Sequence, residues 1–199
     1  MHTRRLCSLL LGAWLAGSLF MVWVATHNLG NVDPMMANPG MQAQRHIRDI
    51  GPDRVRMLMR FQAGELNRYY FETWEVAEII LGIVLAVTLL FATNGNRLMM
   101  ALAGGMIAIP LIQHFTITPQ ILELGRGLDF ATPDQMQAER QSFWGYHNFY
   151  SMLEIVKIAL GFGLAARLLI SMGNSTGRRR RSSSKIDSID DANDGHVNG

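Results

Sequence analysis

The chain has 199 residues, of which 49% are hydrophobic and 17% charged, and its formal net charge is +2. This length fits one compact domain with a tail, and the single cysteine, Cys7, excludes an internal disulfide. The sequence contains no phosphate-binding loop, dinucleotide-binding glycine pattern, paired-cysteine metal motif or nucleophile elbow, and so lacks the signatures of the enzyme classes that use them.

Four apolar stretches are long enough to cross a bilayer, whose hydrocarbon core of about 30 Å takes about 20 helical residues. They cover residues 6–25, 73–93, 98–117 and 147–171. We therefore expect an all-α fold: a polytopic membrane protein whose four transmembrane helices form a bundle within residues 1–173.

The first apolar stretch follows Arg4 and Arg5, as it would in a signal peptide. Its apolar run is longer than the roughly 7–15 residues of a signal sequence, and residues 24–26 make a poor cleavage site. We expect this stretch to remain as the first transmembrane helix.

The segment between the first two spans, residues 26–72, has two parts. Residues 27–51 are rich in glycine, proline and asparagine, which favour turns. Pro52 and Asp53 then suit the first turn of a helix, and no proline follows through residue 91. The second span is therefore predicted to be the end of one long helix that extends beyond the membrane.

The fourth span is predicted to be extended in the same way. A proline-free run begins at Pro133 and Asp134, inside the outer loop predicted at residues 118–146, and continues through residue 172. We expect the two extended helices to pack together outside the membrane. The polar, charged tail at residues 174–199 has little apolar surface to bury and is predicted to be disordered.

The orientation follows from the turns and the basic residues. A tight turn at residues 93–96 makes the second and third spans an antiparallel hairpin. Basic residues lie close to the span ends on the side that holds both chain ends, among them the arginine run at 178–181. We therefore expect both ends to be cytoplasmic, in a bacterial inner membrane. These arginines suit anionic lipid headgroups, and no nucleic-acid partner is predicted.

Small residues four positions apart recur in every span, and such pairs let helices approach closely in lipid. The pairs are Gly12/Ala16, Ala13/Gly17, Gly82/Ala86, Ala101/Gly105, Gly104/Ala108, Ala159/Gly163 and Gly161/Ala165. They predict a tight bundle rather than four loosely associated anchors.

Ionisable residues continue these small-residue faces. On the second span, Glu75 and Glu78 share a helical face with Gly82, and the fourth span repeats the pattern from His147 to Gly161. We therefore expect these groups to point into the bundle, near the outer leaflet. The predicted intramembrane cluster comprises Glu75, Glu78, His114, His147, Tyr150, Glu154 and Lys157.

Four interpretations of this cluster stay open, because a charge at the centre of a membrane helix costs about 2.5–3.5 kcal/mol on insertion scales. An internal Glu–Lys ion pair with histidine hydrogen bonds would lock the bundle. A haem or transition-metal site would use His27, His114 and His147, predicted at one membrane level, with Glu78 as a further ligand. A proton or ion relay would serve a transporter, which with only four spans would act as a homo-oligomer. A non-catalytic scaffold or assembly subunit would bind a membrane partner protein.

No catalytic residue is predicted, and an enzyme is the less favoured class. Three methionines in the first outer loop, Met35, Met36 and Met41, have the soft thioether ligands that suit Cu(I), although packing in an apolar chain is the favoured interpretation. Aromatic residues near the span ends are typical of membrane anchors. These residues are Trp14, Trp23, Trp74, Trp144 and Tyr146.

Three short stretches carry a family resemblance. They are residues 60–70, from Arg60-Phe61 to Tyr69-Tyr70; Pro119-Gln120-Ile121; and Phe143-Trp144-Gly145-Tyr146-His147-Asn148, followed by Ser151. On these residues the chain resembles a small four-span membrane family of unknown function, with bacterial members and the transmembrane protein 205-like group. The resemblance covers most of residues 9–170 and implies a fold, a membrane location and a histidine at the position of His147. It implies no reaction, and the long first loop and basic tail depart from the family pattern.

Overall fold

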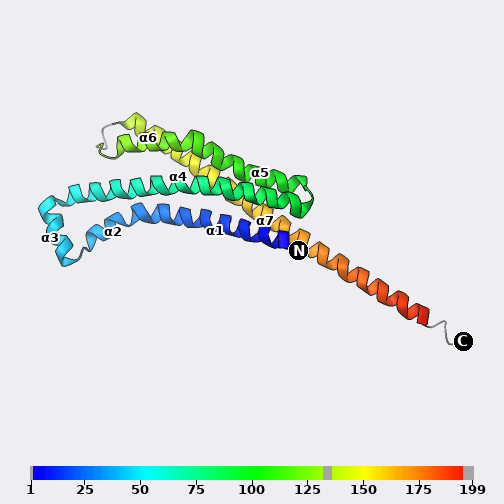
Figure 1. Cartoon of the computed structure of the whole chain (residues 1–199). Coiled ribbons are helices and arrows are strands. Elements are labelled where there is room, and N and C mark those ends of the chain that lie inside the picture. Colours follow the sequence, from blue (N-terminus) through cyan, green and yellow to red (C-terminus); the bar gives the residue numbers. More distant parts are fainter. Residues whose placement is uncertain (1, 132–135, 195–199) are drawn as a thin grey trace.

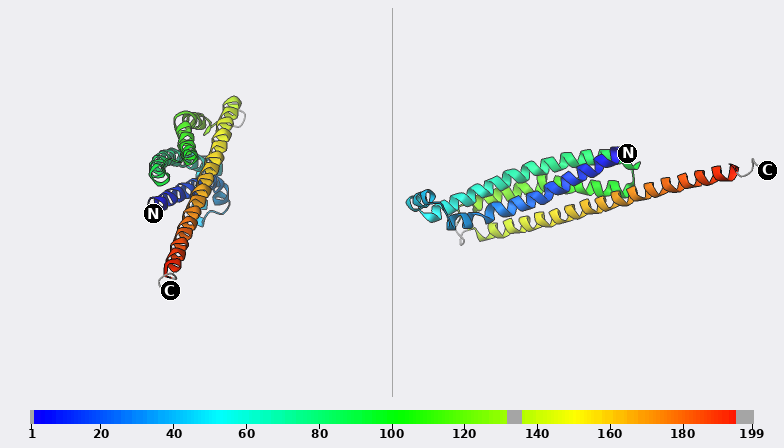
Figure 2. Two further views of the ribbon diagram at one scale, coloured as in Figure 1. Left: turned by 90° about the vertical axis from the view of Figure 1, so that its right-hand side faces the viewer. Right: turned by 90° about the horizontal axis from the view of Figure 1, so that it is seen from below.

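The structure is a computed structural model that describes the backbone of residues 2–131 and 136–194 and the side chains of residues 3–131 and 136–171. Throughout this part of the chain the secondary structure is helical, with no strand. The long helices lie side by side, and α7 continues past the bundle toward the C-terminus (Figures 1 and 2). The elements are α1 (His2–Gly30), α2 (Val32–Ala37), α3 (Met41–Ile50), α4 (Pro52–Thr93), α5 (Arg97–Ile112), the π-helical turn η1 (Gln113–Ile117), α6 (Thr118–Leu128) and α7 (Gln137–Asp194).

Among the described residues, three helical stretches are long and apolar enough that they could cross a membrane. They are Thr3–Ala37, Pro52–Thr93 and Arg97–Leu128. Helix α7 is not one of the three, and its apolar part includes the charged residues Glu154, Lys157 and Arg167. The chain is therefore an all-helical protein with three candidate membrane spans.

Helix α4 confirms the long second helix predicted from the sequence. It begins after Gly51, whose φ of 101° is a backbone conformation that glycine adopts readily. A proline follows in the first turn of the helix. It continues for 42 residues without a break and ends at Asn94, which adopts the left-handed conformation. The Asn96 side chain then accepts a hydrogen bond from the Met99 N–H (3.2 Å) and caps α5. The predicted hairpin between the second and third spans is therefore present.

The two predicted outer loops contain more helix than expected. The first holds the end of α1 and the short helices α2 and α3. In the second, residues 118–128 form α6, which continues α5 through η1. Pro119 did not end the helix because it lies in the first turn of α6, where its missing N–H costs no hydrogen bond. The predicted helix start at Pro133 and Asp134 lies outside the described residues.

The described backbone of α7 is helical through Asp194, into the tail at residues 174–199. The disorder expected for that tail stays a prediction. Extending an existing helix avoids the cost of nucleation, and the arginine-rich segment contains no proline to stop it. Residues 195–199, and the side chains after Ser171, lie outside the described part of the chain.

Four glycines, one in each long helix, mark close contacts that close the bundle into a ring. A Cβ at Gly17, Gly82 or Gly161 would lie within 2.8 Å of a side chain of the next helix, and a Cβ at Gly105 would make a tight contact of 3.0 Å. The pairs are Gly17 with Trp74 (α1 to α4), Gly82 with Ile107 (α4 to α5), Gly105 with Leu160 (α5 to α7) and Gly161 with Leu15 (α7 to α1). Gly12, Gly104 and Gly163, which the sequence placed in the same class, have open space instead. Tight packing through small residues is therefore confirmed for one glycine in each helix.

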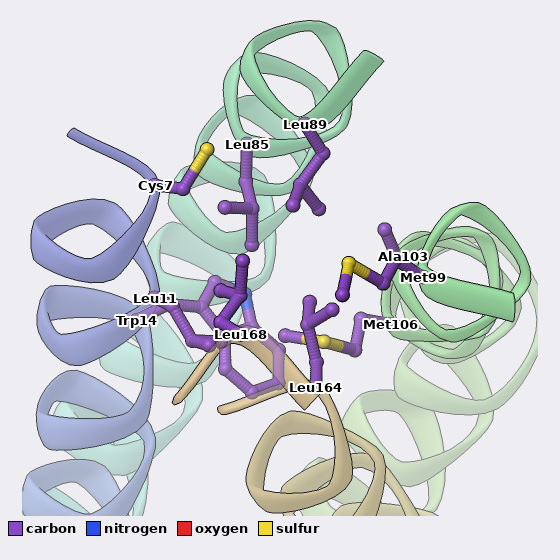
Figure 3. Packing of buried hydrophobic residues seen from close by; sticks show 10 residues of the cluster. All are labelled: Cys7, Leu11, Trp14, Leu85, Leu89, Met99, Ala103, Met106, Leu164 and Leu168. Carbon is purple, nitrogen blue, oxygen red and sulfur yellow. The ribbon is translucent and has the colours of Figure 1, made fainter. Parts of the chain in front are cut away.

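The end of the bundle nearest the 94–96 turn has an apolar interior, which we call the apolar half (Figure 3). It consists of Cys7, Leu11, Trp14, Leu85, Leu89, Met99, Ala103, Met106, Leu164 and Leu168. Trp14 is fully buried and was wrongly predicted as an interfacial anchor, because it faces the other helices rather than lipid. Trp23, Trp144 and Tyr146 are exposed, as anchors are.

Candidate functional site

The inward-facing residues change from apolar to polar beyond Trp14. We call this group the polar cluster: Ser18, Glu75, Glu78, Gln113, His114, Thr118, Tyr150, Glu154 and Lys157. The side chains of Glu75, Glu78 and Lys157 have no exposed surface at all. These three side chains therefore point into the bundle, as their helical spacing predicted.

Lys157 is the centre of the cluster. Its Nζ lies 2.5 Å from Glu78 Oε2 and 2.5 Å from Glu154 Oε1, so it donates to carboxylates of two helices. The same ammonium lies 5.7 Å from the centroid of the Trp14 ring, within the range of a cation–π contact. The second Glu78 oxygen accepts a hydrogen bond from Ser18 Oγ (2.8 Å). Three helices, α1, α4 and α7, are thereby tied together at one level.

Gln113 links this centre to the third span. Its Nε2 donates to Glu154 Oε1 (3.0 Å) and lies 3.5 Å from the Tyr150 carbonyl oxygen. The amide orientation follows from this contact, because a carboxylate requires a donor. Gln113 Oε1 then remains a buried acceptor with no donor among the described residues. Such an acceptor costs roughly 1–3 kcal/mol unless something donates to it.

Glu75 forms the second carboxylate site of the cluster. It accepts a hydrogen bond from Thr118 Oγ1 (2.5 Å), and His114 Nδ1 lies 3.0 Å from its other oxygen. The Tyr150 side chain also contacts it. The His114 side chain is 27% exposed, so the chain of contacts reaches the surface at this residue.

The π-helical turn η1 explains why the third span contributes several of these groups. The Thr118 N–H donates to the Gln113 carbonyl five residues earlier, so their two side chains face the same way. Pro110 and Pro119 flank the turn, and a proline removes one regular helical hydrogen bond. An uninterrupted α-helix would rotate Thr118 away from Gln113.

The charges within the cluster do not balance. Glu75, Glu78 and Glu154 face one lysine and one histidine. Even with His114 protonated, three carboxylates leave one negative charge in excess, and with neutral His114 they leave two. Tyr150 is a neutral phenol in its usual state and does not change this count. A buried charge in excess is costly, so the site favours an additional cation or proton.

The structure joins six of the seven predicted cluster residues and separates the seventh. The His147 ring lies against Phe143, with centroids 6.0 Å apart, and against Trp144, both on its own helix. His147 lies one helical turn before Tyr150, as predicted, but its ring lies against two aromatic side chains of the same helix. It is therefore outside the network of polar contacts.

The predicted metal ligands do not assemble. His27 is exposed, donates to the Trp23 carbonyl of its own helix (2.9 Å) and stacks on the Trp23 ring. It lies nine residues from Ser18, which places it on the opposite face of α1. Glu78 is occupied by Ser18 and Lys157. Among the described residues, no group of three or more His, Cys, Asp or Glu side chains is arranged to hold a metal ion.

Ser18, Gln113 and Thr118 are members of the site that the predicted cluster did not include. Ser18 is four residues from Trp14, hence on the same helical face, which is the one signal that could have identified it. Thr118 lies just past the predicted third span, and only the π-turn brings it inward.

Comparisons with models of known protein families, with curated proteins and with solved structures find no match for this chain. The resemblance to the four-span family therefore stays a prediction, and the function is argued from the polar cluster itself.

Proposed function

We propose that this chain is a four-span membrane protein whose polar cluster takes up and releases a proton, as a component of proton- or ion-coupled transport. The observation that carries the proposal is the excess of carboxylates over cations in a site where Glu75, Glu78 and Lys157 are fully buried. A proton is the smallest charge that can correct this excess, and it needs no cavity.

The fourth span of the proposal is the apolar part of α7. It completes the ring of glycine contacts through Gly105 and Gly161, so it lies alongside the three candidate spans. Its charged residues Glu154 and Lys157 face the cluster rather than lipid, which removes the main objection to placing them in a membrane.

The proposed orientation has both chain ends in the cytoplasm of a bacterial cell. Arg4 Nε lies 3.4 Å from the Ala92 carbonyl, and its Nη1 lies 3.4 Å from the Ser171 carbonyl. The N-terminus, the end of α4 and the end of the apolar part of α7 thus meet at one level, beside Arg97 and Arg167. Basic residues gathered at one end favour that end as cytoplasmic. A reporter fused at Gly199 would then be active in the cytoplasm.

Access to the cluster is one-sided in this arrangement. His114 is partly exposed and contacts Glu75, which also contacts the Tyr150 side chain. Gln113 lies beside the Tyr150 backbone carbonyl and donates to Glu154, which shares Lys157 with Glu78. Beyond Glu78 the path meets Trp14 and the apolar half, whose ten described residues include no carboxylate, lysine or histidine. Protons would therefore exchange with the side nearer His114, and transfer to the other side would need a helix movement or a partner subunit.

A purely structural lock explains less of the geometry. One lysine with one glutamate makes a neutral buried pair. A second and third carboxylate add desolvation cost, and a protonated His114 would compensate only one of them. A proton held on one of these carboxyls would lower that cost. The protonated carboxyl would also be a candidate donor for Gln113 Oε1, which has no hydrogen-bond donor among the described residues.

Infrared difference spectroscopy of the purified protein in detergent tests proton uptake directly. Titration in H₂O and D₂O should reveal a protonated-carboxyl band that disappears in Glu78→Gln or Glu154→Gln and shifts in Glu75→Gln. Glu72→Gln is the matched control, because Glu72 is an exposed carboxylate one turn from Glu75 on the same helix. A wild-type spectrum with no titrating carboxyl assigned to these three residues would refute the proposal.

Transport is tested separately in proteoliposomes that contain a pH-sensitive dye. An imposed potassium potential should drive proton flux through the wild-type protein and the Glu72→Gln control, but not through Glu78→Gln or Glu154→Gln. Proton binding without flux would limit the role to a proton-sensing or partner-dependent subunit. Loss of folding in both variants would instead favour the structural lock.

A further inference from the structure

A cavity of about 500 Å³ lies at the far end of the molecule from the 94–96 turn, where α2, α3 and α4 meet. We call it the methionine cavity, and it is lined by Met35, Met36, Asn38, Pro39, Gly40, Ala43, His46, Ile47, Ile50, Val55 and Met59. It is separate from the polar cluster, and all of its residues lie outside the predicted spans. Three of its eleven lining residues are methionine, in a chain with 13 methionines among 199 residues, so thioethers are concentrated there.

The donor atoms come from three different helices. Met35 and Met36 belong to α2, His46 to α3 and Met59 to α4. Consecutive residues of a helix point about 100° apart, yet both Met35 and Met36 line the cavity. Three methionines and one histidine, from segments up to 24 positions apart in the sequence, therefore belong to the wall of one cavity.

Ordinary packing does not account for these methionines. The Met35 side chain is 61% exposed, and Met36 and Met59 are only partly buried. Helix α3, which carries His46, has no buried residue. A residue placed here for packing would fill the space, whereas these side chains surround an open one.

We propose that the methionine cavity is a binding site for Cu(I), with Met35, Met36, Met59 and His46 as ligands. Thioether sulfur is a soft ligand that selects Cu(I) over hard divalent ions, and imidazole is a common copper ligand. Three rotatable bonds let each methionine side chain adapt its position to an ion bound in the cavity. Met41, which the sequence grouped with Met35 and Met36, is largely exposed and does not line the cavity. Met59 takes its place.

Competition with a chromogenic Cu(I) chelator under anaerobic, reducing conditions tests the site in the full-length protein in detergent. The wild type should retain one Cu(I) per chain, and Met35→Leu/Met36→Leu/Met59→Leu should bind at least tenfold more weakly. Methionine and leucine have similar volumes, so the variant should keep its fold. The matched control is Met57→Leu/Met136→Leu/Met152→Leu. These three methionines are exposed and line no part of the cavity, so the control should bind Cu(I) as tightly as the wild type does.

Two further measurements identify the ligands. X-ray absorption of the wild-type complex should show sulfur neighbours of copper. His46→Gln should weaken binding and remove the nitrogen contribution. Failure of the wild type to retain stoichiometric Cu(I), equal affinity in the triple-leucine variant, or a spectrum without sulfur neighbours would each overturn the proposal.

Discussion

The two halves of the bundle are built on the same four helices, yet their interiors have opposite chemistry. In the apolar half, ten side chains fill the space between helices that approach closely at glycines. In the polar cluster, the same helices present three carboxylates, a lysine and a histidine at equivalent inward positions. Helix association in lipid depends on contact and needs no buried charge, so the apolar half is sufficient to explain why the bundle forms. The polar cluster is the part that requires a functional reason.

The largest effect is expected for Lys157→Met. This change leaves Glu78 and Glu154 buried without their cation, and breaking a buried ion pair from one side costs about 3–5 kcal/mol. The free energy of unfolding, measured with a denaturant titration in detergent, should fall by that order. A change below about 1 kcal/mol would show that the carboxyls are already neutral without the lysine.

A rescue variant separates stability from function. Lys157→Met combined with Glu78→Leu and Glu154→Leu removes all three charged groups, and apolar replacement of a buried charged triad is often neutral or stabilising by about 1–4 kcal/mol. We expect most of the lost stability to return while the titrating carboxyl disappears. A triple variant as unstable as the single one would mean that the cluster is needed to hold the bundle together.

The glycine ring should be the next most sensitive feature. A Cβ at Gly161 would lie 2.8 Å from Leu15 Cδ2 and 3.3 Å from Trp14 Cζ3, so Gly161→Leu should overpack the contact between α7 and α1. Overpacking costs about 1–3 kcal/mol. Gly163→Leu is the control on the same helix, because a Cβ there meets nothing within 4 Å. Equal thermal stability of the two variants would contradict a closed ring.

Ser18→Ala should have a smaller effect. It removes the hydroxyl that donates to Glu78, while Lys157 still compensates the charge, so a loss of about 1 kcal/mol is expected. Ser8→Ala is the matched control, since Ser8 is exposed and bonds only to the Arg4 carbonyl of its own helix. The infrared titration should be more sensitive than the stability measurement. The frequency of the carboxyl band should change in Ser18→Ala and remain unchanged in Ser8→Ala.

The smallest effect is expected outside both halves. Arg60 lies 2.8 Å from Asp33, and both side chains are more than half exposed. Exposed ion pairs contribute about 0–1 kcal/mol and weaken with salt. Arg60→Gln should therefore leave the unfolding midpoint almost unchanged, and any difference should disappear at high ionic strength.

Sequence reasoning identified much of this site because helical periodicity is a local property. Glu75 and Glu78 lie on the same face as Gly82, and all three are buried in the structure. The face of His147 was predicted correctly, but its ring lies against aromatic residues of its own helix and not in the polar cluster. His27 was included because of its membrane level, which does not determine which side of a helix a residue faces. Sequence reasoning also missed Thr118, whose direction depends on the π-turn.

The sequence by itself determined that this chain is helical and apolar enough for membrane spans, where the helix ends lie around Pro52 and Asn94, and which carboxylates face inward. The physical reason is that a backbone in lipid must satisfy its own hydrogen bonds, so long apolar stretches have little choice but to be helical. Only the tertiary structure decided that Lys157 bridges two carboxylates, that Gln113 retains an unmatched acceptor and that three methionines surround one cavity. Those contacts depend on how each helix is rotated against its neighbours, and packing at a few glycines sets that rotation.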